Sequence, residues 1–154
     1  MAQETSKLAT IRQNVFANLF TLINTNKPSD FTFAGKTITW KILSAFPEDN
    51  ADFPCIIINS ALVKPEILGF TGSCFVIEDI EIEIEFYSLA KYGKERIDIG
   101  RDNVQDTLFS NTSTLSDNNL LLNADPFDDS NVDSFISGKE KINTGASIVK
   151  MSLK

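Results

Sequence analysis

The chain has 154 residues, of which 42% are hydrophobic and 23% are charged, as in an ordinary globular protein. This length suits one domain, residues 1–154, and the composition excludes a largely disordered chain. No run of about 18 apolar residues is present, so we expect no membrane span. The start, MAQETSKLAT, lacks the basic and apolar regions of a secretory signal.

Negative charge is concentrated in one stretch of the chain. The net charge is −7, from 14 basic and 21 acidic residues. No Lys or Arg lies within residues 102–137, and the acids there account for the whole imbalance: Asp102, Asp106, Asp117, Asp125, Asp128, Asp129 and Asp133. Because an acidic surface repels phosphates, such a protein is a poor general nucleic-acid binder, yet it can face DNA without holding it.

Histidine is absent, which removes the usual general base, proton shuttle and zinc ligand. Histidine-based catalytic triads and histidine-containing zinc sites are therefore excluded. The two cysteines, Cys55 and Cys74, each lie in an apolar run. We expect buried reduced thiols rather than a disulfide, although adjacent strands would bring the two close.

An amphipathic helix is predicted first. Apolar residues recur at spacings of three and four, namely Leu8, Ile11, Val15, Leu19 and Leu22. The NTNKP segment, residues 24–28, ends this helix because Pro28 disfavours helical angles at the residue before it. We expect the helix to cover one face of a sheet.

A β-hairpin and a buried strand are predicted next. Residues 31–33 and 36–43 flank Ala34-Gly35, and the second run alternates apolar and polar residues, as hairpin strands do. Residues 55–58 are apolar and β-branched, which predicts a central strand buried on both faces.

The clearest pattern lies in residues 75–87. Ile80, Ile82, Ile84 and Phe86 alternate with Glu81, Glu83, Glu85 and Tyr87. Because successive side chains of a strand point to opposite faces, this pattern predicts one apolar face and one acidic, hydrated face.

A second helix is predicted over residues 94–109, with Ile97, Arg101, Val104 and Leu108 near one face. Residues 110–119 are rich in Ser, Thr, Asn and Asp and predict a loop. Residues 120–122, 135–136 and 146–153 are expected as short apolar or closing strands. Strands joined without crossover helices favour antiparallel pairing. We therefore predict an α+β fold: a mainly antiparallel sheet with two amphipathic helices packed on one face, plus a β-hairpin.

The glutamate row invites a catalytic interpretation and a simpler one. Alternate residues on a strand lie about 7 Å apart, which overlaps the separation of carboxylates in inverting glycosidases. Alternating carboxylates are more often a solvated face, and they can also form a functional acidic surface inside an assembly. Glu81, Glu83 and Glu85 are thus candidates for a lining or interface.

A calcium-loop spacing appears in Asp129-x-Asn131-x-Asp133, followed by Glu140. Oxygen ligands occupy positions 1, 3 and 5, and a glutamate occupies position 12. Ser134 stands where the loop usually has glycine, and helical flanks are missing. A turn-rich acidic strand pair is the competing interpretation. No phosphate-binding glycine loop is present, and the small basic KYGKER cluster, residues 91–96, suits either weak nucleic-acid contact or a solvated helix start.

The order of elements resembles that of the tail terminator and tail-completion (head–tail joining) proteins of tailed bacteriophages. The resemblance spans nearly the whole chain and rests on these segments: ETSKLATIRQNVFANLFTLIN, FPEDNADFPCIIIN, CFVIEDIEIEIEFYS, KERIDIGRDNVQDTLF, SFISGKEKIN and ASIVKMSLK.

That resemblance implies a non-enzymatic virion protein without cofactors, assembled in the host cytoplasm. It implies a homo-oligomeric ring, commonly a hexamer, on the head-proximal end of the tail tube. The ring stops tube growth, contacts the tail tube protein and the neck or connector protein, and lets DNA pass through without specific binding. The well-developed hairpin FTFAGKTITWKI departs from the family and would also suit another neck or tail-tube protein. A small calcium-binding module and a hydrolase with paired carboxylates are the rival classes.

Overall fold

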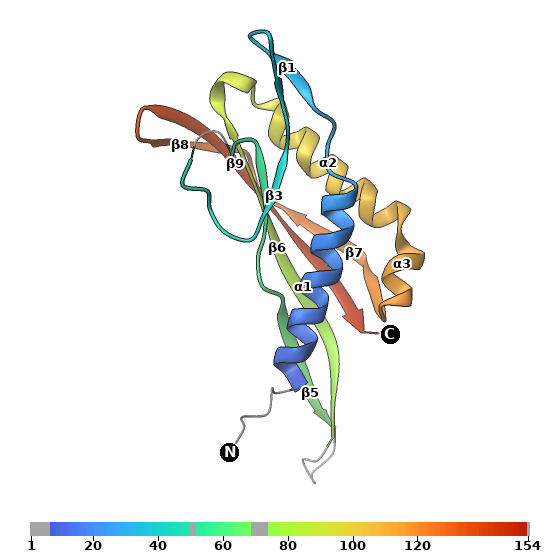
Figure 1. The fold of residues 1–154 in the computed structure, drawn as a ribbon. Helices are drawn as coiled ribbons and strands as arrows, with labels where there is room; N and C mark the ends of the chain where they lie inside the picture. The colour runs from blue at the N-terminus through green and yellow to red at the C-terminus, as the bar shows by residue number, and fades with distance from the viewer. Residues whose placement is uncertain (1–6, 50–51, 69–73, 154) are drawn as a thin grey trace, which may run out of the picture.

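The structure, a computed structural model, describes residues 7–49, 52–68 and 74–153. The helices are α1 (Lys7–Thr25), α2 (Glu95–Ser110) and the short α3 (Thr112–Asp117), with a 3-10 turn, η2, at Ala90–Tyr92. The strands are β1 (Phe31–Phe33), β2 (Lys36–Ile38), β3 (Lys41–Leu43), β4 (Cys55–Ile58), β5 (Leu62–Leu68), β6 (Cys74–Leu89), β7 (Leu120–Asp129), β8 (Asp133–Ser137) and β9 (Glu140–Leu153). Figure 1 shows their arrangement.

One large sheet is built around the long antiparallel pair β6 and β9. The free side of β6 pairs with β5 and then with β4, and β4 pairs with β3. The free side of β9 pairs with β8 and then with β7. The β3–β4 pair is parallel and the other pairs are antiparallel, while β1 and β2 form a separate hairpin. The predicted α+β fold with a mainly antiparallel sheet is confirmed.

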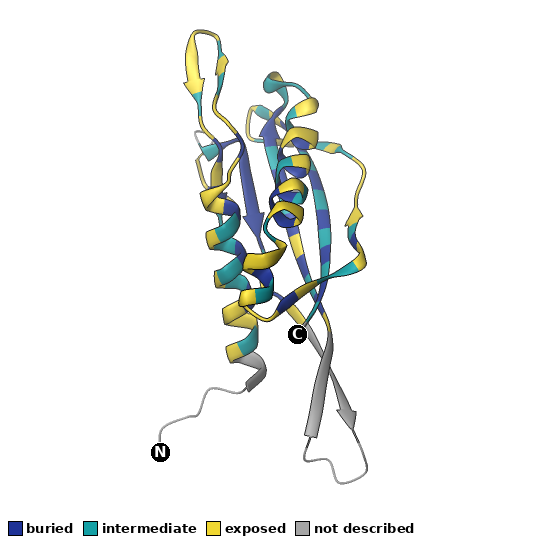
Figure 2. Cartoon of the chain, turned by 90° about the vertical axis from the view of Figure 1, so that its right-hand side faces the viewer, coloured by how far each residue is buried: buried dark blue, intermediate teal, exposed yellow. Residues whose placement is uncertain are grey.

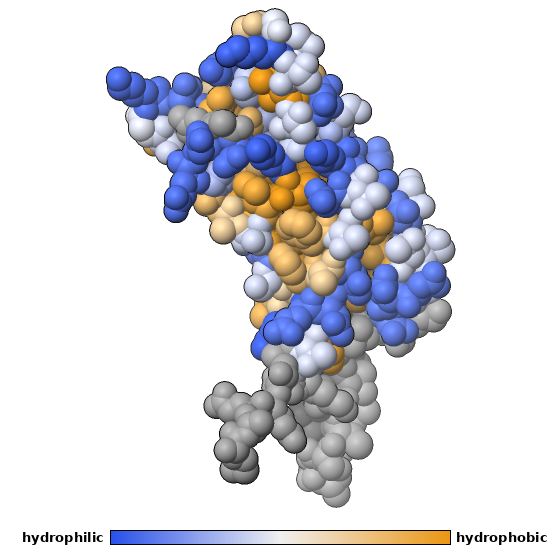
Figure 3. All heavy atoms as spheres, viewed as in Figure 1, coloured by the Kyte–Doolittle hydropathy of each residue, from blue (hydrophilic) through white to orange (hydrophobic). Residues whose placement is uncertain are grey.

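Both long helices cover the same face of this sheet. Helix α1 contacts β3 and β5, and α2 contacts β6 and β9. In Figure 2 the two helices lie side by side in front of the strands. In Figure 3 apolar side chains gather in the middle of the molecule, with hydrophilic residues above and below them.

The predicted apolar faces meet in the core between the helices and the sheet. Ile80, Ile82, Ile84 and Phe86 of β6 are fully buried there. They share one cluster with α1 and α2 residues, among them Val15, Leu19, Ile97, Val104 and Leu108. Burying one such side chain stabilises the fold by roughly 1.5–3 kcal/mol. The apolar residues of β6 therefore hold one face of the strand against the helices, and the alternate residues point away from them.

Helix α2 approaches the sheet closely at two points. A Cβ on Gly100 would lie 2.7 Å from the Trp40 ring, and one on Gly145 of β9 would lie 2.5 Å from the Arg101 guanidinium. The glycine within α2 therefore makes room for Trp40, which is fully buried. Arg101 is also buried on the predicted inner face of the helix.

A second apolar cluster lies on the opposite face of the sheet. It contains Phe53, Cys55, Ile57, Leu89 and Ile142. The predicted burial of the β4 strand on both faces is therefore confirmed, because Ile56 and Ile58 belong to the helix-side core. Among the described elements, α1 and α2 pack on the other face, and neither covers the rest of this one.

The two cysteines are far apart. Cys55 pairs in register with Tyr87, whereas Cys74 pairs with Leu68 near the start of β6. Tyr87 and Cys74 are 13 positions apart on one strand, which is roughly 40 Å at a rise of ~3.3 Å per residue. A disulfide needs Cα atoms within about 7 Å, and these two backbone positions are several times farther apart.

Several predicted boundaries were wrong. The run 36–43 is divided into β2 and β3 at Thr39 and the fully buried Trp40, and β3 joins the large sheet. The predicted loop 110–119 contains α3, which is anchored by the buried Leu115. Tertiary burial of single apolar residues outweighs local propensity in both places.

The later strands are longer than predicted, and one strand was missed. Strand β7 continues to Asp129 through an irregularity before Phe127, and β9 starts at Glu140. The missed strand, β5, contains Pro65. Proline lacks the N–H that a central strand needs, and β5 accommodates it at the sheet edge, where the register also shifts.

Candidate functional site

The predicted glutamate row lies on the uncovered face of the sheet. Glu83 is exposed, and Glu81 and Glu85 are half-buried, while the isoleucines between them face the helices. The prediction of one apolar and one acidic face is confirmed.

Glu85 is held in place by two neutral donors. Its carboxylate accepts a hydrogen bond of 2.9 Å from the Tyr87 hydroxyl and one of 3.0 Å from the Asn59 side-chain amide. Burial and the hydrogen bond to Glu85 raise the pKa of Tyr87 to about 12. Burial, with the charges of Asp52 and Glu85, raises the pKa of the Cys55 thiol to about 12. Both groups are therefore protonated at neutral pH and are poor nucleophiles.

Two carboxylates flank an apolar residue in the middle of the uncovered face. The register aligns Glu83 of β6 with Ile148 of β9, and Ile148 with Asp128 of β7. Strands lie about 4.8 Å apart, so the two carboxylates are roughly 10 Å apart across the sheet. Neither side chain makes an ion pair or hydrogen bond within the described residues.

The surface around Ile148 is hollowed. One open depression of ≈ 450 Å³ is lined by Glu81, Glu83, Glu85 and Ile148, together with Asn59, Ser60 and Leu62 at the start of β5. A second of ≈ 240 Å³ is lined by Glu83, Asp128 and Ile148 and their neighbours. We call Glu81, Glu83, Glu85, Asp128 and Ile148 the acidic face. Its shape suits an inserted side chain or hairpin better than an enclosed small molecule.

A second acidic surface runs along α2. Glu95, Asp98, Asp102 and Asp106 recur at spacings of three and four, and all four are exposed. We call them the α2 stripe. Like charges four residues apart repel one another on a helix, so the stripe costs α2 some stability. The acidic stretch identified in the sequence begins at Asp102 and so leaves out Glu95 and Asp98, although their helical spacing was visible there.

The predicted basic cluster is divided by the structure. The Arg96 guanidinium lies 3.7 Å from the centre of the Phe31 ring, and the Lys91 ammonium lies 5.9 Å from that of Tyr92. The Arg96 contact ties α2 to the β1–β2 hairpin, whereas the Lys91 contact lies within η2. Lys94 is exposed. Arg96 is therefore a packing residue, and the cluster does not form one basic patch.

Asp129, the first candidate calcium ligand, is engaged elsewhere. Its carboxylate accepts hydrogen bonds from the Gln105 amide at 2.9 Å and 3.0 Å and from the Ser147 hydroxyl at 2.7 Å. It therefore fastens the end of β7 to α2 and β9. Asn131 is exposed in the connection that follows.

The remaining candidate ligands lie at different ends of a hairpin. Asp133 is opposite Thr144, whereas Glu140 is opposite Ser137. Glu140 is four residues from Thr144, which is the residue opposite Asp133, so the two acids are roughly 13 Å apart along the hairpin. Calcium ligands lie within about 2.6 Å of the ion, so the hairpin does not assemble the predicted set. Within the described ranges, no three His, Cys, Asp or Glu side chains are grouped to hold a metal ion.

Comparison with known proteins adds no relative. No family model matches the chain, and no curated protein matches it. In the part of the chain that the structure describes, no helix is long and apolar enough to cross a membrane.

Proposed function

We propose that this protein is a structural component of a phage virion. It forms a ring, commonly of six copies, at the head-proximal end of the tail tube, where it ends tube growth and joins the tube to the neck. The order of elements along the chain supports this proposal, as does an α+β fold with helices on one sheet face and part of the other face open. In this role the protein has no reactive centre and works through its contacts.

The observation that carries the proposal is that the described residues present two acidic surfaces, one on each side of the molecule. The acidic face lies on the sheet, and the α2 stripe lies on the outer side of a helix that covers the other face. A subunit of a head-to-tail ring needs complementary surfaces for its two neighbours and a further surface that lines the channel. Acidic side chains along the channel repel the DNA backbone and let it slide.

We assign the channel to the α2 stripe and the subunit contact to the acidic face. The stripe exposes carboxylates along a convex helix, which suits a wall that DNA passes. The acidic face is hollowed and has Ile148 at its centre, which suits a protein contact. Of the two roles expected for Glu81, Glu83 and Glu85, the interface role therefore fits their surroundings better.

A related neck or tail-tube protein is the second candidate. The β1–β2 hairpin favours it, because this hairpin forms its own sheet and projects from one end of the molecule (Figure 1). It is held to the body by Phe31 and Phe33, whose rings lie 5.3 Å and 5.0 Å from that of Tyr92. A projecting hairpin of this kind suits contact with an adjacent ring.

The test is to add the purified protein to growing tail tubes and to locate it by gold-labelled antibody in electron micrographs. We expect label at one end of each tube, and a tube-length distribution that stops lengthening after addition. Label distributed along the tube wall would favour the tube-protein alternative. Absence of label from tubes, tails and necks of intact particles would overturn the proposal.

A further inference from the structure

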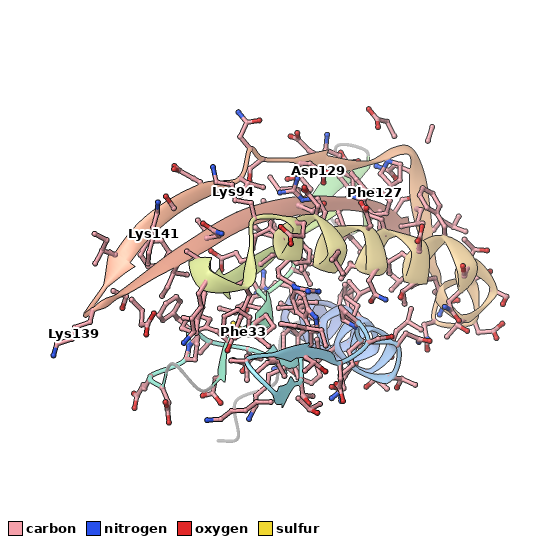
Figure 4. All side chains as sticks on the ribbon, turned by 90° about the horizontal axis from the view of Figure 1, so that it is seen from above. Phe33, Lys94, Phe127, Asp129, Lys139 and Lys141 are labelled. Carbon is pink, nitrogen blue, oxygen red and sulfur yellow. The ribbon has the colours of Figure 1, made fainter. Side chains whose placement is uncertain are left out.

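The β8–β9 hairpin carries an apolar residue beside unpaired lysines. Ile136 is 76% exposed, and it lies opposite Lys141 in the register. Lys139 lies in the two-residue turn, next to Gly138 at φ 63°. Figure 4 shows Lys139 at the outer end of this hairpin, with Lys141 and Lys94 toward the same end of the molecule. We call Ile136, Lys139 and Lys141 the basic tip.

The basic tip is free to contact another molecule. Lys139 and Lys141 are exposed and make no ion pair with any described residue. The short turn with a positive φ at Gly138 is the kind that fixes a hairpin's twist, so the tip is presented on a rigid support. An apolar side chain this exposed costs free energy in water, and covering it is favourable.

The tip and the acidic face are complementary in chemistry. The tip has Ile136 beside two cations, and the face has Ile148 between the unpaired Glu83 and Asp128. Docking the tip into the depressions around Ile148 would bury both isoleucines and pair each lysine with a carboxylate. Such complementarity favours the correct partner and register over other contacts.

One chain cannot make this contact with itself. Lys141 and Ile148 lie on the same strand, β9, seven residues apart, which is roughly 23 Å. Because seven is odd, the two side chains also point to opposite faces of the sheet. The tip therefore reaches the acidic face of a different copy, and a head-to-tail contact of this type closes into a ring when its rotation allows.

We propose that the basic tip of one copy docks into the acidic face of a second copy, and that this contact builds the ring. This inference rests on the proposed function, and it names the two surfaces through which the copies of the ring contact one another. Every copy then offers one tip and one face, so all copies in a closed ring are equivalent.

The test uses two variants whose charges are reversed on different surfaces. Variant T carries K139E and K141E, and variant F carries E83K and D128K. In T the tip and the face are both acidic, and in F the tip and the two positions that flank Ile148 are all basic, so neither variant pairs with itself. Mixed together, each T tip meets an F face and each F tip meets a T face. We expect wild type to associate, T and F alone to associate on the order of tenfold more weakly or worse, and the mixture to recover.

Sedimentation velocity on the full chain measures the association of wild type, of each variant and of the mixture. A control with K27E and K36E reverses two exposed lysines outside the tip and should associate like wild type. Association of T alone at the wild-type level, or no recovery on mixing, would overturn the inference. Unfolded variants are recognised by circular dichroism.

A cross-link extends the test to weak association. On a C74S background, chains carrying I136C are mixed with chains carrying I148C and oxidised gently. We expect a disulfide-linked dimer to form much faster than in a mixture of I99C and I148C chains, since Ile99 is exposed elsewhere on α2. An equal rate overturns the docking contact. If the tip contact forms but the protein never locates to tubes or necks, the proposed function fails and the docking inference stands.

Discussion

At the scale of single residues, the uncovered face is organised by Glu85. Its carboxylate accepts hydrogen bonds from Tyr87 and Asn59 and lies near the buried Cys55. The charge of Glu85 adds to the burial that raises the pKa values of both Cys55 and Tyr87. The same arrangement that keeps these groups unreactive at neutral pH makes the fold sensitive to alkali.

We predict that stability falls as the pH rises above 9. The Cys55 thiol has a usual pKa of 9.0 and a folded-state pKa of about 12. Between these values the unfolded chain loses its proton while the folded chain keeps it, so each added pH unit disfavours folding by on the order of 1 kcal/mol. Below pH 9 both states are protonated and the effect is absent. Urea unfolding at several pH values measures it.

The variant C55A should reduce the fall in stability between pH 9 and 12, because it removes one of the two groups with a raised pKa and leaves only Tyr87. The variant I57V is the matched control, since it removes volume from the same cluster without a titrating group. It should lower the stability curve evenly and leave its slope unchanged. Equal slopes for C55A and wild type would contradict the prediction.

At the scale of helices and strands, patterns inside one element were readable from the sequence. The apolar residues of α1 recur at helical spacing, and those of β6 alternate with polar ones. The buried face of each element was therefore predicted correctly. Strand β5 was missed because Pro65 looks like a strand breaker until an edge position is known. Helix α3 was missed because its polar residues suggest a loop, and only the burial of Leu115 favours a helix.

The α2 stripe yields the prediction that belongs to this scale. Reversing two of its charges with D102K and D106K should make the assembled protein retain DNA, because cations in the channel attract the phosphate backbone. Wild type should retain essentially none. Retention should fall steeply as salt rises, and fluorescence anisotropy of a labelled duplex measures it.

The control for the stripe reverses two exposed acids elsewhere, with D30K and E48K. This pair has the same net charge as the stripe variant. If the two variants retain DNA equally, overall charge explains the result and the stripe is not the channel wall.

At the scale of the whole molecule, the acidic face could not have been derived from the sequence alone. Glu83 was a candidate from its strand pattern, but Asp128 lies in a distant acidic run. The two meet around Ile148 only because β9 is placed between β6 and β7. The candidate calcium ligands are not brought together for a related reason. Their spacing along the chain matches a calcium loop, but this segment folds as a hairpin, which separates Asp133 from Glu140.

The arrangement of the surfaces predicts how assembly responds to salt. Contacts between exposed lysines and carboxylates weaken as the Debye length falls from about 10 Å at 0.1 M to about 3 Å at 1 M. The average size in sedimentation should therefore decrease over this range. Replacing the apolar part of the contact, with I136S, should reduce association at every salt concentration, whereas I99S should not. Association that is unchanged by salt, or equally reduced by both serine variants, would place the contact between copies elsewhere on the molecule.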